Sequence, residues 1–200
     1  MAKNVWRWRR SVRPRAGNIW GAARALLLMR YYSSLFIAAL AGAFVLQAAD
    51  NPLSTELKQN YEQRKNALLA EADRMADADY SFKATPDVGT FGSRVAHVAD
   101  AQIMICSAVK GETKKPETAG KTSKADLVAA LKASFDYCDG AYDSLTDAAA
   151  TQTVKIFGQP QTKLSALWGN LAHDSEMYGY MAVYLRLKGL VPPSSDRRPK

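Results

Sequence analysis

The 200-residue chain has few side chains of the kinds that bind metals or act as nucleophiles: two histidines, His97 and His173, and two cysteines, Cys106 and Cys138. It contains no glycine-rich nucleotide loop, no CxxC pair, no zincin motif and no Ser-His-Asp pattern. The sequence therefore gives no basis for a nucleotide-binding protein, a dithiol oxidoreductase, a zincin protease or a serine hydrolase. A metal site built from imidazole has two histidines at most.

Acidic residues are absent from the first 48 positions, which hold eight of the 27 lysines and arginines. The other 19 basic residues are matched by 19 aspartates and glutamates, so the formal net charge of +8 belongs to the beginning of the chain. A nucleic-acid-binding domain usually carries a basic patch or stripe. The neutral remainder therefore argues against nucleic acid as a partner.

The apolar run at residues 35–46 has only 12 residues, fewer than the roughly 20 that a transmembrane helix needs. It follows a basic segment and precedes small residues, a pattern typical of a secretory signal peptide. We therefore expect residues 1–48 to be a basic leader and signal peptide, and the protein to be exported to the periplasm or the extracellular space. An uncleaved leader is the alternative, and the only membrane contact that we expect. Met29 precedes a signal of ordinary length and is a second candidate for the functional start.

Residues 49–195 have the length of one domain with a single core. Apolar residues recur at three- and four-residue steps in four segments, at about 52–75, 90–109, 123–145 and 162–188. Apart from a short extended pattern at 153–157, no strand pattern competes with these helices, and residues 196–200 are expected to form a flexible tail. The sequence predicts an all-α four-helix bundle.

Local signals mark the ends of these helices. Ser123 and Asp126 form a pair like a capping box at the start of the third segment, and Gly111 and Gly189 are placed to end the second and the fourth. Residues 111–122 are rich in Lys, Thr, Pro and Gly and are long enough to cross over an end of the bundle.

The two histidines lie in the middle of the second and fourth helical segments. His97 shares a helical face with Ala101 and Met104, and His173 has Met177 four residues later on its own face. Histidines on facing helices are a common way for bundles to build metal sites. The alternative is that each histidine hydrogen-bonds a neighbour in the packed bundle and binds nothing.

Two stretches resemble the second and fourth helices of DinB-like proteins: TFGSRVAHVADAQIMICSAVKGE at 90–112 and LWGNLAHDSEMYGYMAVYLRLKGLVPPSS at 167–195. The resemblance implies a four-helix bundle with an up-down-down-up order and a long crossover between its second and third helices. Members of this family typically bind a divalent metal through three histidines, one on the second helix and an H-x3-H pair on the fourth. Some are thiol-dependent transferases or isomerases.

Carried over to this chain, the resemblance assigns His97 as the first ligand and His173 as the second, whereas Met177 stands where the third histidine is expected. Imidazole suits Zn, Ni, Fe or Cu, whereas a thioether is a poor ligand for most of these and favours Cu(I). The expected cofactor is a divalent ion of Zn, Ni, Fe or Mn, or Cu if Met177 binds it, or none. Three interpretations stay open. The site is degraded and Met177 fills space without any metal, or Asp100, Glu176 or water completes a weak site, or Met177 helps to bind a soft metal.

Asp100 and Glu176 each follow a histidine by three residues and are candidates for orienting it, with Tyr180 as a further neighbour of the site. This order is the reverse of the Glu-x-x-His motif of di-iron bundles. Cys106 and Cys138 lie on apolar helical faces, and the family order of helices places them at about the same height. An exported protein permits a disulfide between them, although buried free cysteines are the alternative.

These observations predict an exported DinB-like protein of unassigned activity, with a divalent-metal site that is degraded at Met177. A metal-dependent hydrolase or thiol-dependent transferase is one alternative. The other is a non-catalytic bundle that binds an unknown small molecule or a partner through a lining of Met104, Met177, Tyr180 and Tyr184. The family resemblance also raises a homodimer, without identifying its surface.

Overall fold

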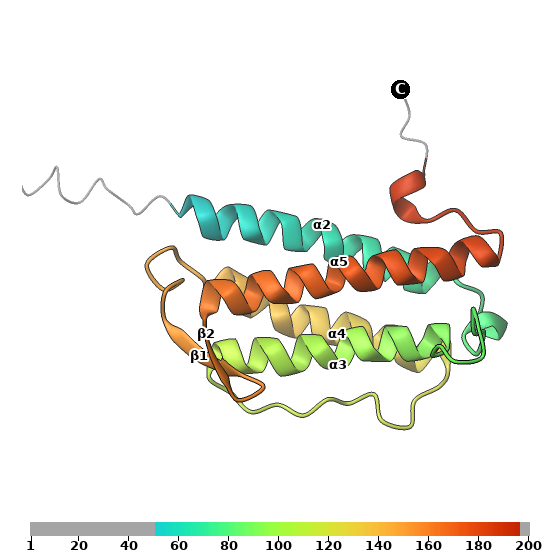
Figure 1. Ribbon diagram of the computed structural model, residues 1–200, viewed down its shortest axis with the longest axis horizontal. Helices are drawn as coiled ribbons and strands as arrows, with labels where there is room; N and C mark the ends of the chain where they lie inside the picture. Colours follow the sequence, from blue (N-terminus) through green and yellow to red (C-terminus); the bar gives the residue numbers. More distant parts are fainter. Residues whose placement is uncertain (1–50, 197–200) are drawn as a thin grey trace, which may run out of the picture. The chain divides into compact units, whose positions relative to one another are not determined.

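The computed structural model describes residues 51–196 (Figure 1). The expected leader, signal peptide and Met29 start lie outside the described residues, as does the expected tail apart from Asp196. This part of the chain contains four long helices, as predicted: α2 (Pro52–Arg74), α3 (Phe91–Lys110), α4 (Lys124–Asp143) and α5 (Lys163–Leu187). Two short 3-10 helices, η1 (Asp77–Asp79) and η2 (Pro193–Ser195), follow α2 and α5.

The expected helix ends are found where local chemistry placed them. The Ser123 hydroxyl accepts a hydrogen bond from the Asp126 backbone N–H at 3.1 Å and lies 2.7 Å from the Asp126 carboxylate. Gly111 and Gly189 both have a φ of 74°, the left-handed conformation that glycine adopts most easily at the end of a helix. These signals act within one turn of the helix, so they can be read from the sequence alone.

A β-hairpin precedes α5 and requires one correction to the strictly all-α prediction. Strand β1 (Thr153–Ile156) pairs antiparallel with β2 (Gln159–Thr162). Phe157 and Gly158 form the two-residue turn with φ values of 50° and 80°, as hairpin turns of the primed type require. The first strand coincides with the extended pattern at 153–157. The second strand lies outside that pattern. It contains Pro160, a residue that is tolerated in a strand at the edge of a sheet.

Each helix packs against two others: α2 and α3 both contact α4 and α5. The core between them contains large side chains that are almost fully buried, among them Tyr61, Phe91, Phe135, Tyr142, Leu167 and Met181. The segment between α3 and α4 runs along the outside of the bundle (Figure 1). Thr118 holds this segment in place through a hydrogen bond from its hydroxyl to the Asp100 carboxylate at 2.6 Å.

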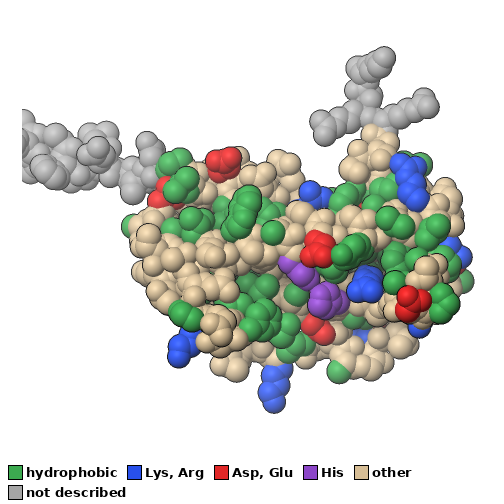
Figure 2. Space-filling model, in the orientation of Figure 1, with side chains coloured by type: hydrophobic (Ala, Val, Ile, Leu, Met, Phe, Trp, Pro, Cys, Tyr) green, Lys and Arg blue, Asp and Glu red, His purple; other side chains and the backbone are tan. Residues whose placement is uncertain are grey.

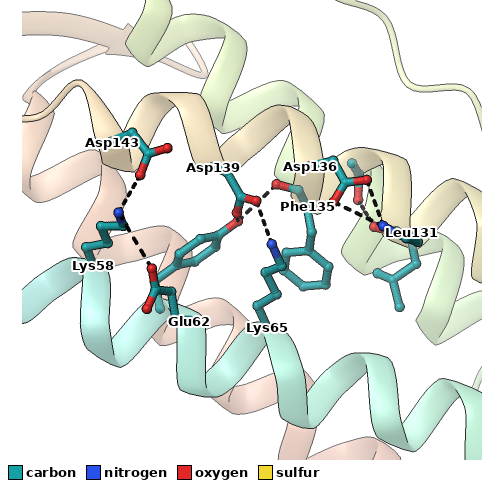
Figure 3. Close-up of polar contacts among 11 residues, drawn as sticks. Lys58, Glu62, Lys65, Leu131, Phe135, Asp136, Asp139 and Asp143 are labelled. Atoms are coloured by element: carbon teal, nitrogen blue, oxygen red, sulfur yellow. Dashed lines mark hydrogen bonds and ion pairs between the residues drawn. The ribbon is translucent and has the colours of Figure 1, made fainter.

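Polar contacts join α2 to α4 along one seam of the bundle (Figure 3). Lys58 pairs with Asp143 at 2.7 Å, and Lys65 pairs with Asp139 at 2.6 Å. The buried Tyr61 hydroxyl donates to the same Asp139 carboxylate at 3.0 Å. Because these charges are paired with one another, we interpret the seam as a structural contact between the two helices.

Among residues 51–196, no helix has both the length and the apolar character that crossing a membrane demands.

Candidate functional site

His97 on α3 and His173 on α5 meet at the surface of the bundle. Their Nε2 atoms are 3.0 Å apart, and the ring centroids are 5.0 Å apart with an angle of 63° between the ring planes. Figure 2 shows the histidine side chains in contact with each other, with acidic side chains on two sides and a basic one beside them. The structure thus brings together the two histidines that the sequence singled out.

The environment of His97 favours its uncharged imidazole form. Partial burial lowers the pKa of His97, and the neighbouring His173 and Arg94 lower it further. The carboxylates of Asp100 and Glu176 act in the opposite direction but do not reverse the shift. A neutral imidazole keeps a ring nitrogen with a free lone pair, which is the form that binds a metal.

A buried carboxylate lies behind His173. The Asp174 side chain is fully buried, and its Oδ1 atom is 3.8 Å from Nδ1 of His173, an ion-pair distance that is longer than a hydrogen bond. The Gln102 amide nitrogen donates to both Asp174 oxygens, at 2.7 and 2.6 Å. Burial raises the pKa of Asp174, and the opposite effects of His173 and Gln102 do not reverse this shift. Among the described residues Nδ1 of His173 has no hydrogen-bond partner, so Asp174 acts on this ring from a distance. A carboxylate on the far side of a histidine is the arrangement that orients histidine ligands in metal sites.

The polar contacts continue from Gln102 into the core. Asn170 donates from its side-chain amide to the side-chain oxygen Oε1 of Gln102 at 2.9 Å and to the Tyr142 hydroxyl at 3.1 Å. The Tyr142 hydroxyl in turn donates to the Leu167 carbonyl at 2.9 Å. These hydrogen bonds connect α3, α4 and α5, so the position of Asp174 behind His173 is fixed by three helices.

The sequence analysis missed Asp174, Gln102 and Asn170. One signal was available, because Asn170 and Asp174 are four residues apart and interrupt the apolar stripe of α5. Residues at this spacing share a helical face, and polar groups on a buried face require hydrogen-bond partners. Their partners, however, lie on other helices.

The other candidate residues near the histidine pair make different contacts. Asp100 accepts its hydrogen bond from Thr118 on the crossover segment, and Glu176 accepts one from the Tyr180 hydroxyl at 2.8 Å. Tyr180 is 47% exposed and does not line a cavity as expected. Met177 is buried in the apolar core one helical turn after His173.

Tyr184 and Met104, which were also expected to line the binding surface, have different environments in the structure. Tyr184 is buried and donates a hydrogen bond to the Gly89 carbonyl, whereas Met104 is exposed on α3. The cysteines lie deeper in the bundle. Cys106 on α3 and Cys138 on α4 are joined by a disulfide, with their Cα atoms 5.3 Å apart.

The side chains around the histidine pair can supply two protein ligands for a metal ion but not a third. Bonds from a metal to imidazole nitrogen are about 2.0–2.1 Å long, so two nitrogen atoms 3.0 Å apart are close enough to bind the same ion. Within residues 51–196, however, no group of three or more His, Cys, Asp or Glu side chains is arranged to hold a metal ion. The residues present therefore do not form the three-histidine centre that the resemblance implied.

The fold and the site together define a helical bundle with a pair of histidines between two of its helices. A family model, the DinB superfamily, matches residues 60–181, and the chain belongs to this superfamily. No curated protein matches the chain.

Solved structures with the same fold include two DinB-like proteins. The one from Bacillus cereus ATCC 10987 has a TM-score of 0.61 and 21% identity, over 68% of this chain and 93% of the other. The one from Bacillus subtilis has a TM-score of 0.55 and 16% identity, over 67% and 92%. A mycothiol-dependent maleylpyruvate isomerase has a TM-score of 0.53 and 16% identity, over 64% of this chain and 60% of the isomerase. At these identities the likeness concerns the fold alone.

Proposed function

We propose that this protein is an exported DinB-superfamily bundle that binds one divalent metal ion weakly and reversibly through His97 and His173. The observation that carries the proposal is the 3.0 Å separation of the two Nε2 atoms. The pair is a reduced form of a three-histidine centre, with Met177 in the third position. A divalent ion bound there would polarise a water or thiol in its open positions.

The residues behind the pair have a positioning role in this proposal. Asp174 faces Nδ1 of His173 and favours the tautomer that carries its proton on that nitrogen, which leaves the lone pair on Nε2. Gln102 holds the Asp174 carboxylate by two hydrogen bonds and so prevents it from turning toward the surface.

We expect weak metal binding because Met177 stands where a third histidine ligand would be. Met177 offers only a thioether, which suits Cu and is a poor ligand for Zn, Ni, Fe or Mn. Met177 is also buried in the apolar core, so its side chain packs against other apolar residues. Two imidazoles then supply all the protein ligands for a hard or borderline ion, and water fills the other positions. A metal-dependent hydrolase or thiol-dependent transferase would need firmer binding than this set provides.

Export is part of the proposal, and the disulfide between Cys106 and Cys138 supports it. Disulfides persist in oxidising compartments and are rare in the cytosol. We also infer the up-down-down-up order of the helices. The disulfide joins the C-terminal part of α3 to the C-terminal part of α4. This is expected if the two helices run in parallel and the segment between them crosses back along the bundle.

Zinc titration tests the metal proposal directly. The full chain is expressed without a polyhistidine tag, and the purified protein is titrated with Zn²⁺ by isothermal calorimetry. We expect one weakly bound ion per chain and loss of binding in His97→Ala and in His173→Ala. The control Met104→Ala removes an exposed side chain from the same helix as His97 and should bind zinc like the wild type. Unchanged binding in His97→Ala, or no binding by the wild type, would refute the proposal.

A further inference from the structure

The guanidinium of Arg94 has no partner on the surface that carries the histidine pair. Arg94 lies on α3, one helical turn before His97, and is partly buried. Among the described residues, its side chain forms no hydrogen bond and no ion pair. By contrast, Arg74 on α2 pairs with Asp196 at 2.8 Å. Because arginine is seldom buried without an oppositely charged partner, Arg94 is a candidate for binding an anion from solution.

The guanidinium of Arg94 reaches back to the beginning of α3. Its Nη2 and Cζ atoms lie 3.4 and 3.6 Å from the point that a Cβ atom on Gly89 would occupy, and Gly89 precedes the N-cap residue Thr90. Helical side chains tilt toward the N-terminus, which explains this direction. The N-terminus of a helix carries a partial positive charge, and the first turn of α3 contains no acidic residue that would offset it. The positive side chain and the positive helix end therefore lie together, an arrangement that an anion would stabilise.

Arg94 also lies close to the histidine pair and to α5. Its charge contributes, after partial burial and His173, to the lowered pKa of His97. Glu176 raises the pKa of Tyr180, and the charge of Arg94 opposes that rise. Tyr180 is 47% exposed, and apolar side chains surround the histidines on this side of the molecule (Figure 2). Arg94, His97 and Tyr180 therefore border one surface, to which α3 and α5 both contribute.

The two carboxylates near the histidines do not neutralise Arg94. Asp100 and Glu176 each accept a hydrogen bond from a neighbouring hydroxyl, at 2.6 and 2.8 Å, and among the described residues neither forms an ion pair with Arg94. Both oppose the lowering of the His97 pKa, so their negative charge is felt at the histidines. A ligand with one negative charge is matched by Arg94, whereas a second negative charge would be repelled by these carboxylates.

We propose that Arg94 binds the carboxylate of a small organic acid with a single negative charge, and that the apolar body of this acid lies on Tyr180 beside the histidine pair. The planar guanidinium matches a carboxylate through two parallel hydrogen bonds. The exposed ring of Tyr180 offers an apolar surface to the rest of the ligand. Neither contact requires a metal ion, so this proposal goes beyond the proposed function and can fail or succeed independently of it.

An NMR titration of the isotope-labelled full chain with benzoate, at neutral pH and with EDTA present, tests the proposal. We expect saturable shifts at the beginning of α3 and around Tyr180, and an affinity that is about tenfold or more weaker in Arg94→Gln. Benzamide has nearly the same shape without the charge and should not bind. Sulfate carries two negative charges and should bind more weakly than benzoate. No binding of benzoate, equal binding of benzamide, or tighter binding of sulfate would overturn the proposal.

The matched control is Arg186→Gln, which removes the same charge from an exposed arginine of α5. This variant should bind benzoate like the wild type, and an equal loss in both variants would overturn the proposal in favour of a general effect of charge. Arg94→Lys keeps the charge but loses the planar fork, so it should bind benzoate more weakly than the wild type. The melting temperature of Arg94→Gln should not fall, because no ion pair is lost. A marked fall would assign Arg94 a structural role and contradict the proposal.

Discussion

Replacing Glu71 by glutamine should stabilise this protein at neutral pH. Glu71 lies on α2 and is fully buried, and neither of its carboxylate oxygens has a hydrogen-bond partner among residues 51–196. Burial raises its pKa from the ordinary value of 4.5 to about 8, although the positive charges of Arg64 and Arg74 lower it. A buried carboxyl without partners disfavours its charged form because the charge loses the solvation of water.

The size of the effect follows from the two pKa values. Between pH 4.5 and 8 the folded state holds a proton on Glu71 that the unfolded state has released, so the free energy of unfolding falls as the pH rises through this window. Each pH unit above 4.5 lowers the free energy of unfolding by about 1.4 kcal/mol. At pH 7 the total loss is therefore about 3 kcal/mol. Below pH 4.5 the carboxyl is protonated in both states, and this difference disappears.

Urea denaturation of the wild type and Glu71→Gln at about pH 4 and about pH 7 measures the effect. The stability of the variant relative to the wild type should rise by about 3 kcal/mol between the two conditions. Glu56→Gln on the exposed side of the same helix is the matched control. If the Glu71→Gln variant differs from the wild type by the same amount at both pH values, the assignment of a raised pKa to Glu71 is wrong.

Three further predictions concern the site and the disulfide. Asp174→Asn should weaken zinc binding by about tenfold or more, because His173 loses the carboxylate that orients it. Asp100→Asn should leave the zinc affinity measured by calorimetry unchanged. An equal loss of zinc affinity in both variants would contradict the role of Asp174. Reducing the bridge between Cys106 and Cys138, which are 32 residues apart, should lower the free energy of unfolding by about 3–4 kcal/mol in urea; unchanged stability would contradict this. In metal-free protein the pKa of His97, followed by NMR, should lie below 6.5 because partial burial disfavours its charged form; a value above 6.5 would show that the carboxylates dominate.

The parts of the fold that could be predicted from the sequence depend on neighbours in the chain. The four helices follow from apolar periodicity, and their ends follow from residues such as Gly111 and Ser123 that act within one turn. The hairpin was predicted only in part. Gln159–Thr162 has no alternating apolar pattern and contains a proline, so its pairing with β1 depends on the turn at Phe157 and Gly158.

The candidate site could be predicted less completely, because it depends on contacts between helices. The residue pattern allowed His97 and His173 to converge, but only the family resemblance paired them, and the structure supplies the distance. The burial of Asp174 could not be read from its residue type, since an aspartate on a helix is usually exposed. The exposure of Tyr180 likewise depends on the fold and not on its residue type. Its ring extends from the outer side of α5, where its hydroxyl reaches Glu176.

In the proposed metal site His97 and His173 supply two ligands, and Met177 stands where the family resemblance implies a third histidine. Restoring the missing imidazole with Met177→His tests this claim most directly, by comparing the zinc affinity of this variant with that of the wild type by calorimetry. The account predicts that affinity rises by about tenfold or more, and that the gain disappears when His97→Ala is added. If Met177→His binds zinc no more tightly than the wild type while remaining folded, His97 and His173 do not form two corners of such a site.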